Sequence, residues 1–147
     1  MRRWSKLQKR IYAIVDPSID WQIHCVVYRY NGWNRIKTVP RYFITLDGRI
    51  LFDCPKDYPI IRDREHYWDS ISLHVDTAIS RISNLLEEYL NAPSEKRLVM
   101  KDPWGIIDIV RATDRRIGKR RWHDLFAVSN DAARQVLIAR EIAANRH

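Results

Sequence analysis

Residues 22–54 read QIHCVVYRYNGWNRIKTVPRYFITLDGRILFDC and predict an antiparallel β-sheet. Three segments of this stretch, 22–30, 41–46 and 49–54, are rich in the β-branched and aromatic residues that favour strands. The sequences NGWN and DG separate them, and Asn, Asp and Gly tolerate the positive φ angles of hairpin turns. A three-stranded meander is therefore predicted. Because Pro40 has no amide hydrogen for the ladder, we expect the middle strand to start at or after it, or to bulge there.

The side chains of the first strand are expected to divide between the two faces of the sheet. Adjacent residues of a strand point to opposite faces, so Cys25 should face the helices and His24 the other side. Cys25 and Cys54 do not form a C-x-x-C motif. We expect both to be reduced, partly buried thiols.

Two helices are predicted to pack on this sheet. Apolar residues recur at steps of three and four over residues 4–15, and Pro17 ends the pattern because it disfavours helical geometry. The longest periodic segment covers residues 68–90. Its apolar stripe is wide, which favours a core helix across the sheet and leaves open a helix that also forms a dimer contact.

The C-terminal third is predicted to be helical. One helix begins with Asp102 as its cap and Pro103 at the first helical position, where a missing amide hydrogen costs nothing. The last helix, residues 130–145, follows a cap at Ser129 or Asn130. The apolar residues that we expect it to direct towards a core are Ala133, Val136, Leu137 and Ile142.

These elements predict an α+β fold, because strands grouped together and followed by helices do not form a parallel βαβ sheet. We expect one domain over residues 1–147, with the meander packed on an N-terminal helix and a long central helix and with a helical C-terminal third. Hydrophobic residues make up 46% and charged residues 30%, the balance of a folded protein. No apolar run approaches the ~20 residues that cross a bilayer. We therefore expect a cytoplasmic protein with no membrane contact.

Residues 114–122, DRRIGKRRW, carry five positive charges in nine positions. A helix restarted at Asp114 would place the apolar side chains of this region on one face and the cations on the other. The apolar set is Ile117, Trp122, Leu125, Phe126 and Val128. The opposite face carries the candidate anion-binding residues Arg116, Lys119, Arg120 and His123. With the preceding helix, this arrangement is similar to a helix-turn-helix that contacts phosphates, and the alternative is an ordinary solvated face.

The formal net charge of +8 favours contact with a nucleic acid or another polyanion. Catalytic motifs are scarce: no H-E-x-x-H, G-x-S-x-G, P-loop or G-x-G-x-x-G pattern occurs. We expect no metal and no cofactor. An enzyme acting on a small or phosphorylated substrate stays open as an alternative, in a pocket between the sheet and the long helix that would use Asp53, His24 or Arg29.

Three apolar residues are candidates for contact with a partner. Trp33 lies in the NGWN turn, where an exposed ring could anchor another protein, or else fold back onto its own sheet. Trp68 and Ile82 lie on the wide stripe of the long helix. We predict a homo-oligomer, most simply a two-fold dimer, formed through this helix or through the free sheet face. A regulator or immunity-like protein that binds another protein is a further alternative.

Several segments resemble a family of small uncharacterised bacterial proteins found in genomes and in mobile accessory DNA. They are RWSKLQK, IDWQIHCVVYR, PRYFITLDG with FDCPKDYP, and DRRIGKRR. The resemblance spans most of the chain and implies a compact intracellular domain. It implies no activity and no catalytic residue, so the sequence alone leaves the ligand open.

Overall fold

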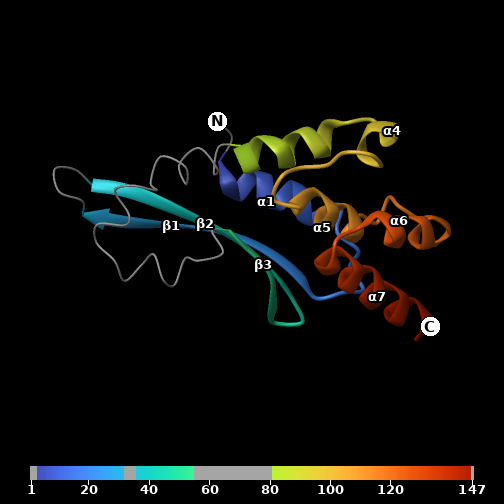
Figure 1. The fold of residues 1–147 in the computed structure, drawn as a ribbon. Coiled ribbons are helices and arrows are strands. Elements are labelled where there is room, and N and C mark those ends of the chain that lie inside the picture. Colours follow the sequence, from blue (N-terminus) through green and yellow to red (C-terminus); the bar gives the residue numbers. More distant parts are fainter. Residues whose placement is uncertain (1–2, 32–35, 55–80, 147) are drawn as a thin grey trace.

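The structure is a computed structural model that describes residues 3–31, 36–54 and 81–146. It has the predicted α+β architecture, in which helices precede and follow a three-stranded antiparallel sheet. The elements are α1 (Trp4–Tyr12), β1 (Trp21–Asn31), β2 (Ile36–Leu46), β3 (Arg49–Cys54), a helix over 81–91, α4 (Ser94–Arg97), α5 (Ile106–Thr113), the 3₁₀ helix η1 (Lys119–Arg121), α6 (Trp122–Val128) and α7 (Asp131–Asn145). Figure 1 shows β1 and β2 extending away from the helices, which gather at the other end of the sheet.

The sheet is the predicted meander, with strand order β1-β2-β3 and antiparallel pairing throughout. Asp47 and Gly48 form the turn between β2 and β3, with φ angles of 52° and 80°. The positive φ expected of the DG sequence is therefore present. The NGWN turn, residues 32–35, lies outside the described residues.

The prediction for Pro40 is wrong, because β2 begins at Ile36 and passes through the proline without a bulge there. Pro40 pairs with Val27 of β1, whereas the pairing of β2 with β3 begins only at Tyr42. A strand tolerates proline where one side has no neighbour to receive an amide hydrogen. The irregularity in the sheet lies instead between Ile44 and Thr45.

The two faces of the sheet differ as predicted. The core face carries the buried residues Trp21, Ile23, Tyr42, Ile44 and Leu46. Cys25 packs against this core, and both cysteines are free thiols of intermediate burial. His24 lies on the opposite face, where its ring stacks on that of Phe43 with 4.8 Å between the centroids.

Helix α1 packs on the core face through its apolar stripe. Leu7 and Ile11 are buried, and the ring of Trp4 meets that of Tyr42 edge-on at 5.4 Å. The helix ends at Tyr12, three residues before the predicted end at Val15. Val15 is buried all the same, because it forms an isolated β-bridge with Asp114.

The long central helix was predicted over residues 68–90, of which 68–80 lie outside the described residues. The described part, 81–91, carries the buried residues Ile82, Leu86 and Tyr89. It packs on the core face of the sheet, and the hydroxyl of Tyr42 hydrogen-bonds to that of Ser83 at 2.6 Å. Figure 1 shows this helix beside α1.

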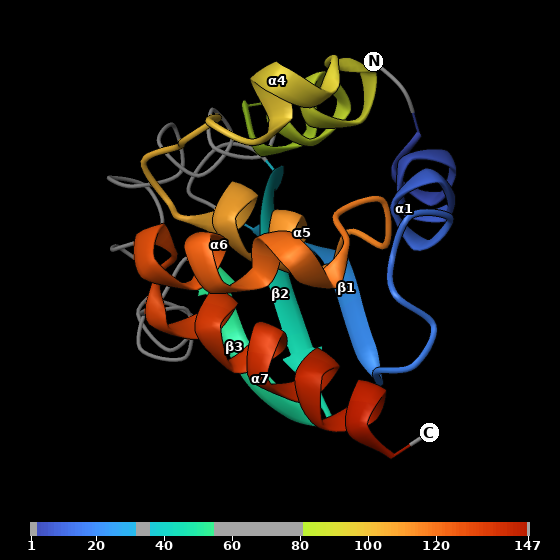
Figure 2. The same cartoon turned by 90° about the vertical axis from the view of Figure 1, so that its right-hand side faces the viewer.

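Helix α5 is the central helix of the described structure, since each of its residues is buried. It packs against α7, and Figure 2 shows α6 and α7 in front of it, with the sheet behind. The predicted start at Pro103 is wrong: the helix begins at Ile106, after Gly105 with φ 79°. Asp102 still caps it from a distance, because its carboxylate accepts hydrogen bonds from the amides of Ile106 and Ile107.

Helix α7 begins at Asp131, with Asn130 as the predicted cap. The side chain of Asn130 accepts a hydrogen bond of 2.9 Å from the amide of Ala133. Ala133, Val136 and Leu137 are buried as expected, whereas Ile142 is 50% exposed. Ile142 lies on the same face of α7 as the 46% exposed Ile138, and both line a pocket at the surface, whereas Arg140 between them is buried.

Candidate anion-binding site

The backbone of residues 113–115 is tied to the N-terminal part of the chain. The amide of Arg115 donates to the carbonyl of Ile14 at 2.7 Å, and that of Asp16 donates to the carbonyl of Thr113 at 2.8 Å. These bonds end α5 at Thr113 and turn the chain away from it. The predicted break near Asp114 is therefore present, but the helix does not restart there: 3₁₀ structure begins at Lys119 and α-helix at Trp122.

Asp114 makes both local and long-range contacts: its carboxylate accepts a hydrogen bond of 2.9 Å from the backbone amide of Arg116, yet no helix begins there. Its carboxylate is fully buried and accepts hydrogen bonds from the Tyr89 hydroxyl at 2.7 Å and from Nη2 of Arg116 at 2.8 Å. Burial alone would raise the pKa of Asp114, but the bonds from Arg116 and Tyr89 outweigh it and hold this pKa below its ordinary value. The ionised carboxylate of Asp114 thus holds the side chain of Arg116 in place.

The other end of this loop is held by Arg140 of α7. Its guanidinium donates to the carboxylate of Asp16 at 2.8 Å and to the carbonyls of Ala112 and Ile117. It also lies 4.6 Å from the centre of the Trp122 ring. Because Arg140 is buried and joins four distant segments, the backbone before η1 is held in one position.

The basic segment, residues 115–121, carries its cations on this fixed backbone. Arg115, Lys119, Arg120 and Arg121 are exposed, and none of them forms an ion pair or side-chain hydrogen bond with another described residue. Arg116 is the exception because it is paired with Asp114. Four positive charges therefore face solvent within one short stretch.

An open pocket of about 160 Å³, here called the arginine pocket, adjoins the basic segment. It is lined by Ser94, Arg97, Leu98, Arg116, Ile117 and Arg121. Arg97 comes from α4, whose position is fixed because the fully buried Arg111 donates to the carbonyls of Arg97 and Met100. Three arginines, one from α4 and two from the basic segment, thus line one small opening.

A second pocket, of about 350 Å³, lies on α6 and α7 and is here called the aromatic pocket. Its lining consists of Lys119, Trp122, His123, Phe126, Leu137, Ile138 and Glu141. The predicted separation of charge from apolar bulk is wrong here, because Lys119 and His123 line the same pocket as Trp122 and Phe126. Phe126 and Val128 are exposed at 39% and 57%, whereas Ile117 and Leu125 are buried as predicted. The prediction assumed one helix that begins at Asp114. Because the 3₁₀ helix begins at Lys119 and the α-helix only at Trp122, the side chains of residues 119–128 point in other directions than predicted.

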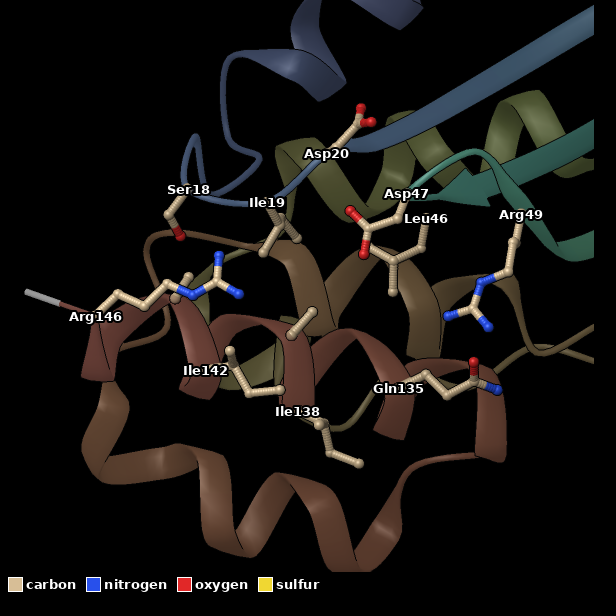
Figure 3. A pocket seen from close by; sticks show the side chains of 12 residues that line it. Ser18, Ile19, Asp20, Leu46, Asp47, Arg49, Gln135, Ile138, Ile142 and Arg146 are labelled. Atoms are coloured by element: carbon tan, nitrogen blue, oxygen red, sulfur yellow. The ribbon is translucent and has the colours of Figure 1, made fainter.

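A third pocket, of about 420 Å³, lies between α7 and the end of the sheet where β1 begins and β2 turns into β3 (Figure 3). Figure 3 shows Gln135 and Ile142 of α7, with Arg146 just after the helix, on one side and the segment with Ser18 and Asp20 on the other. Its charged side chains are of both signs, which favours neither anions nor cations.

The candidate partner contacts are placed differently. Trp33 and Trp68 lie outside the described residues. Ile82 is 0% exposed and belongs to the core of the chain itself, so it has no surface to offer a partner.

Two residues of the alternative enzyme site, His24 and Asp53, line none of the three pockets described above. His24 and Asp53 lie on the sheet face away from the 81–91 helix, and Asp53 is paired with Arg41 at 2.7 Å. The side chain of Arg29 lies outside the described residues. In the parts of the chain that the structure describes, no group of three or more His, Cys, Asp or Glu side chains could hold a metal ion.

The protein is thus an α+β domain whose helical end carries the basic segment. The chain belongs to the SF0329 protein family, whose sequence model matches residues 3–141. Among curated proteins and among solved structures, the searches found no match. Within the described ranges no helix has both the length and the apolar character that a membrane crossing needs.

Sequence reasoning missed the residues that hold the site, namely Tyr89, Arg97, Arg111 and Arg140. Tyr89 was assigned to an apolar stripe, and the three arginines were not distinguished from surface charges. Arg111 offers one signal: in the largely apolar stretch IIDIVRA it lies three residues after Asp108, and an arginine buried there needs acceptors such as that carboxylate, which it binds at 2.7 Å.

Proposed function

We propose that this protein binds the phosphate groups of a polyanion, with nucleic acid as the partner, through the basic segment. The proposal rests on four exposed cations that have no acidic partner among the described residues. The backbone that carries them is held in position by the contacts of Asp114 and Arg140. Cations held in place lose less conformational freedom on binding than cations on a mobile tail.

The arginine pocket supports the proposal because guanidinium groups match the geometry of phosphate oxygens. Arg97 of α4 and Arg116 and Arg121 of the basic segment line the pocket, and each guanidinium has more donors than its described contacts use. Arg116 keeps its charge while it is bound to Asp114, since that bond raises its pKa.

Net charge adds a long-range contribution. With a formal net charge of +8, the chain attracts polyanions before contact, although salt screens this attraction beyond about 8 Å at physiological ionic strength. The local cations therefore decide affinity, and the overall charge affects mainly the rate of association.

The test compares two variants with equal loss of charge. K119A/R120A/R121A removes three cations of the basic segment, and R3A/K6A/K9A removes three exposed cations of the α1 region. Binding of a labelled single-stranded oligonucleotide of about twelve nucleotides is followed by fluorescence anisotropy at about 50 mM salt. We expect at least about tenfold weaker binding for the first variant and under about threefold for the second. Equal losses would contradict the proposal, as would no binding by the wild type.

We further propose that the protein acts in the cytoplasm of a bacterial cell and forms a two-fold homodimer. Because Ile82 is buried, the dimer contact would use the sheet face with the exposed Val26, or the long helix outside its buried stripe. Sedimentation at micromolar concentration tests this, and Val26→Asp should yield a folded monomer if the sheet face is used. A wild type of monomer mass would contradict the dimer.

A further inference from the structure

The aromatic pocket lies directly beside the basic segment, and the two share a residue. Lys119 begins η1 and also lines the pocket, while Trp122 and His123 follow η1 in the sequence. A ligand with both a phosphate and an apolar ring could therefore occupy the two features together. We infer that the aromatic pocket holds an unpaired base of a single-stranded nucleic acid, and this inference rests on the proposed function.

The lining of the pocket matches the faces and the edge of a base. The rings of Trp122, His123 and Phe126 contribute the flat surfaces on which bases stack, and Ile138 adds an aliphatic wall. The volume of about 350 Å³ lies at the lower end of the ~300–1,000 Å³ typical of small-molecule pockets. A single base with its sugar is a ligand of this kind.

Two of the rings are held in position by arginines. Arg140 covers Trp122 at 4.6 Å, and Arg134 covers Phe126 at 5.1 Å from its ring centre. The indole nitrogen of Trp122 also donates to the carbonyl of Ile117 at 3.3 Å. Each ring thus has a fixed orientation and still lines the pocket, so a base would meet a preformed surface.

The charges around the pocket orient such a ligand. Lys119 lies on the side of the basic segment and can bind a phosphate, whereas Glu141 repels phosphate and can accept hydrogen bonds from the polar edge of a base. The base would then point towards α7, with its phosphate on η1.

The pocket selects single strands over duplexes. In a duplex the faces of each base are covered by its neighbours, so a base enters a pocket only after unstacking. Unpaired bases are free to stack on aromatic side chains, and that contact does not depend strongly on sequence. A rigid duplex would contact the basic segment through its phosphates alone.

The experiment measures binding of oligothymidylate and of an abasic oligomer with the same number of phosphates. We expect the wild type to bind oligothymidylate about five- to 150-fold more tightly, the range that stacking of one base provides. Phe126→Ala removes an exposed wall of the pocket and should abolish most of this preference. Val128→Ala, at a more exposed position of the same helix outside the pocket, should leave it unchanged.

Ile138→Glu provides a second pocket variant, because this exposed residue can be replaced without disturbing the core. It should also abolish the preference, while a circular dichroism spectrum shows that the fold is retained. Equal wild-type affinity for the two oligomers would overturn the base pocket and leave phosphate binding intact, with an apolar side chain of a partner protein as the remaining occupant. If both pocket variants still preferred oligothymidylate to the abasic oligomer, the base pocket would be overturned too. No binding of either oligomer would instead refute the proposed function itself.

Discussion

Asp114 is the residue on which the geometry of the basic segment depends. Its folded-state pKa is lowered, because the bonds from Arg116 and Tyr89 outweigh the effect of burial. A carboxyl group with a lowered pKa contributes stability above its unfolded pKa of about 3.9, and this contribution is lost as the pH falls through the folded value. We therefore predict that the free energy of unfolding falls as the pH is lowered below about 4.

Asp114→Asn separates this effect from general acid unfolding. The variant should be less stable by about 2 kcal/mol near neutral pH, the range of hydrogen bonds to a charged group, and should lose less stability than the wild type on acidification. Asp16 retains part of the acid response, because its pKa is lowered by bonds from Ser18 and Arg140 against the effect of burial. Denaturant titrations over a pH series measure both quantities. An unchanged acid response in the variant would contradict the assignment.

Gly105 and Gly48 form a matched pair of left-handed residues, with φ angles of 79° and 80°. A Cβ at Gly48 would meet nothing within 4 Å, whereas one at Gly105 would lie 2.6 Å from Nδ2 of Asn130, the cap of α7. Gly48→Ala should cost about 1 kcal/mol of backbone strain, and Gly105→Ala about 1 kcal/mol more because the cap is displaced. Chemical denaturation of both variants measures the difference. Equal losses would show that the cap adjusts freely.

Single residues also mark the limit of what the sequence could predict. The alternation of β1 correctly placed Cys25 and His24, because side-chain direction in a strand follows from local geometry alone. The burial of Arg111 and Arg140 could not be read in this way. Their acceptors include carbonyls of residues 11 to 28 positions away, which only the folded chain brings together.

At the scale of elements, Arg140 joins α7 to α5, to the basic segment and to the N-terminal part of the chain. Arg140→Met keeps an apolar stem but removes the buried guanidinium that donates to Asp16 and to the carbonyls of Ala112 and Ile117. We predict a loss of about 3 kcal/mol or more, as for other broken buried pairs. The control is Lys96→Ala, which removes an ion pair with Glu88 whose side chains are about half exposed, and it should cost less than about 1 kcal/mol. Similar losses for the two variants, measured by thermal or denaturant unfolding, would contradict the role of Arg140.

Element boundaries were predicted less well than element types. The sheet, α1 and α7 follow from periodicity and from turn and cap residues, which act over a few positions. The break after Thr113 was also predicted, but a helix start at Asp114 was expected from its capping ability. That carboxylate accepts a hydrogen bond from the amide of Arg116, but it also binds Tyr89, 25 residues away, and its backbone bridges to Val15. Long-range contacts therefore overrode the local preference and placed His123 and Lys119 in one pocket with Phe126.

At the scale of the whole molecule, the described structure separates a packed core from a charged helical end. The core formed by the sheet, α1, the 81–91 helix and α5 uses the apolar residues that the sequence pattern identified. The cations on η1 lie outside this core, so replacing them should leave the fold intact. Function at this end can therefore be tested apart from stability.

The salt dependence of nucleic-acid binding tests the central claim most directly. For single strands, each cation that displaces a counterion adds about 0.7 to the slope of log K against log salt concentration, so K119A/R120A/R121A should reduce the magnitude of the slope by about 2. R3A/K6A/K9A should keep a slope close to that of the wild type, although it loses the same charge. If K119A/R120A/R121A showed the same slope as the wild type, this result would contradict phosphate binding by the basic segment.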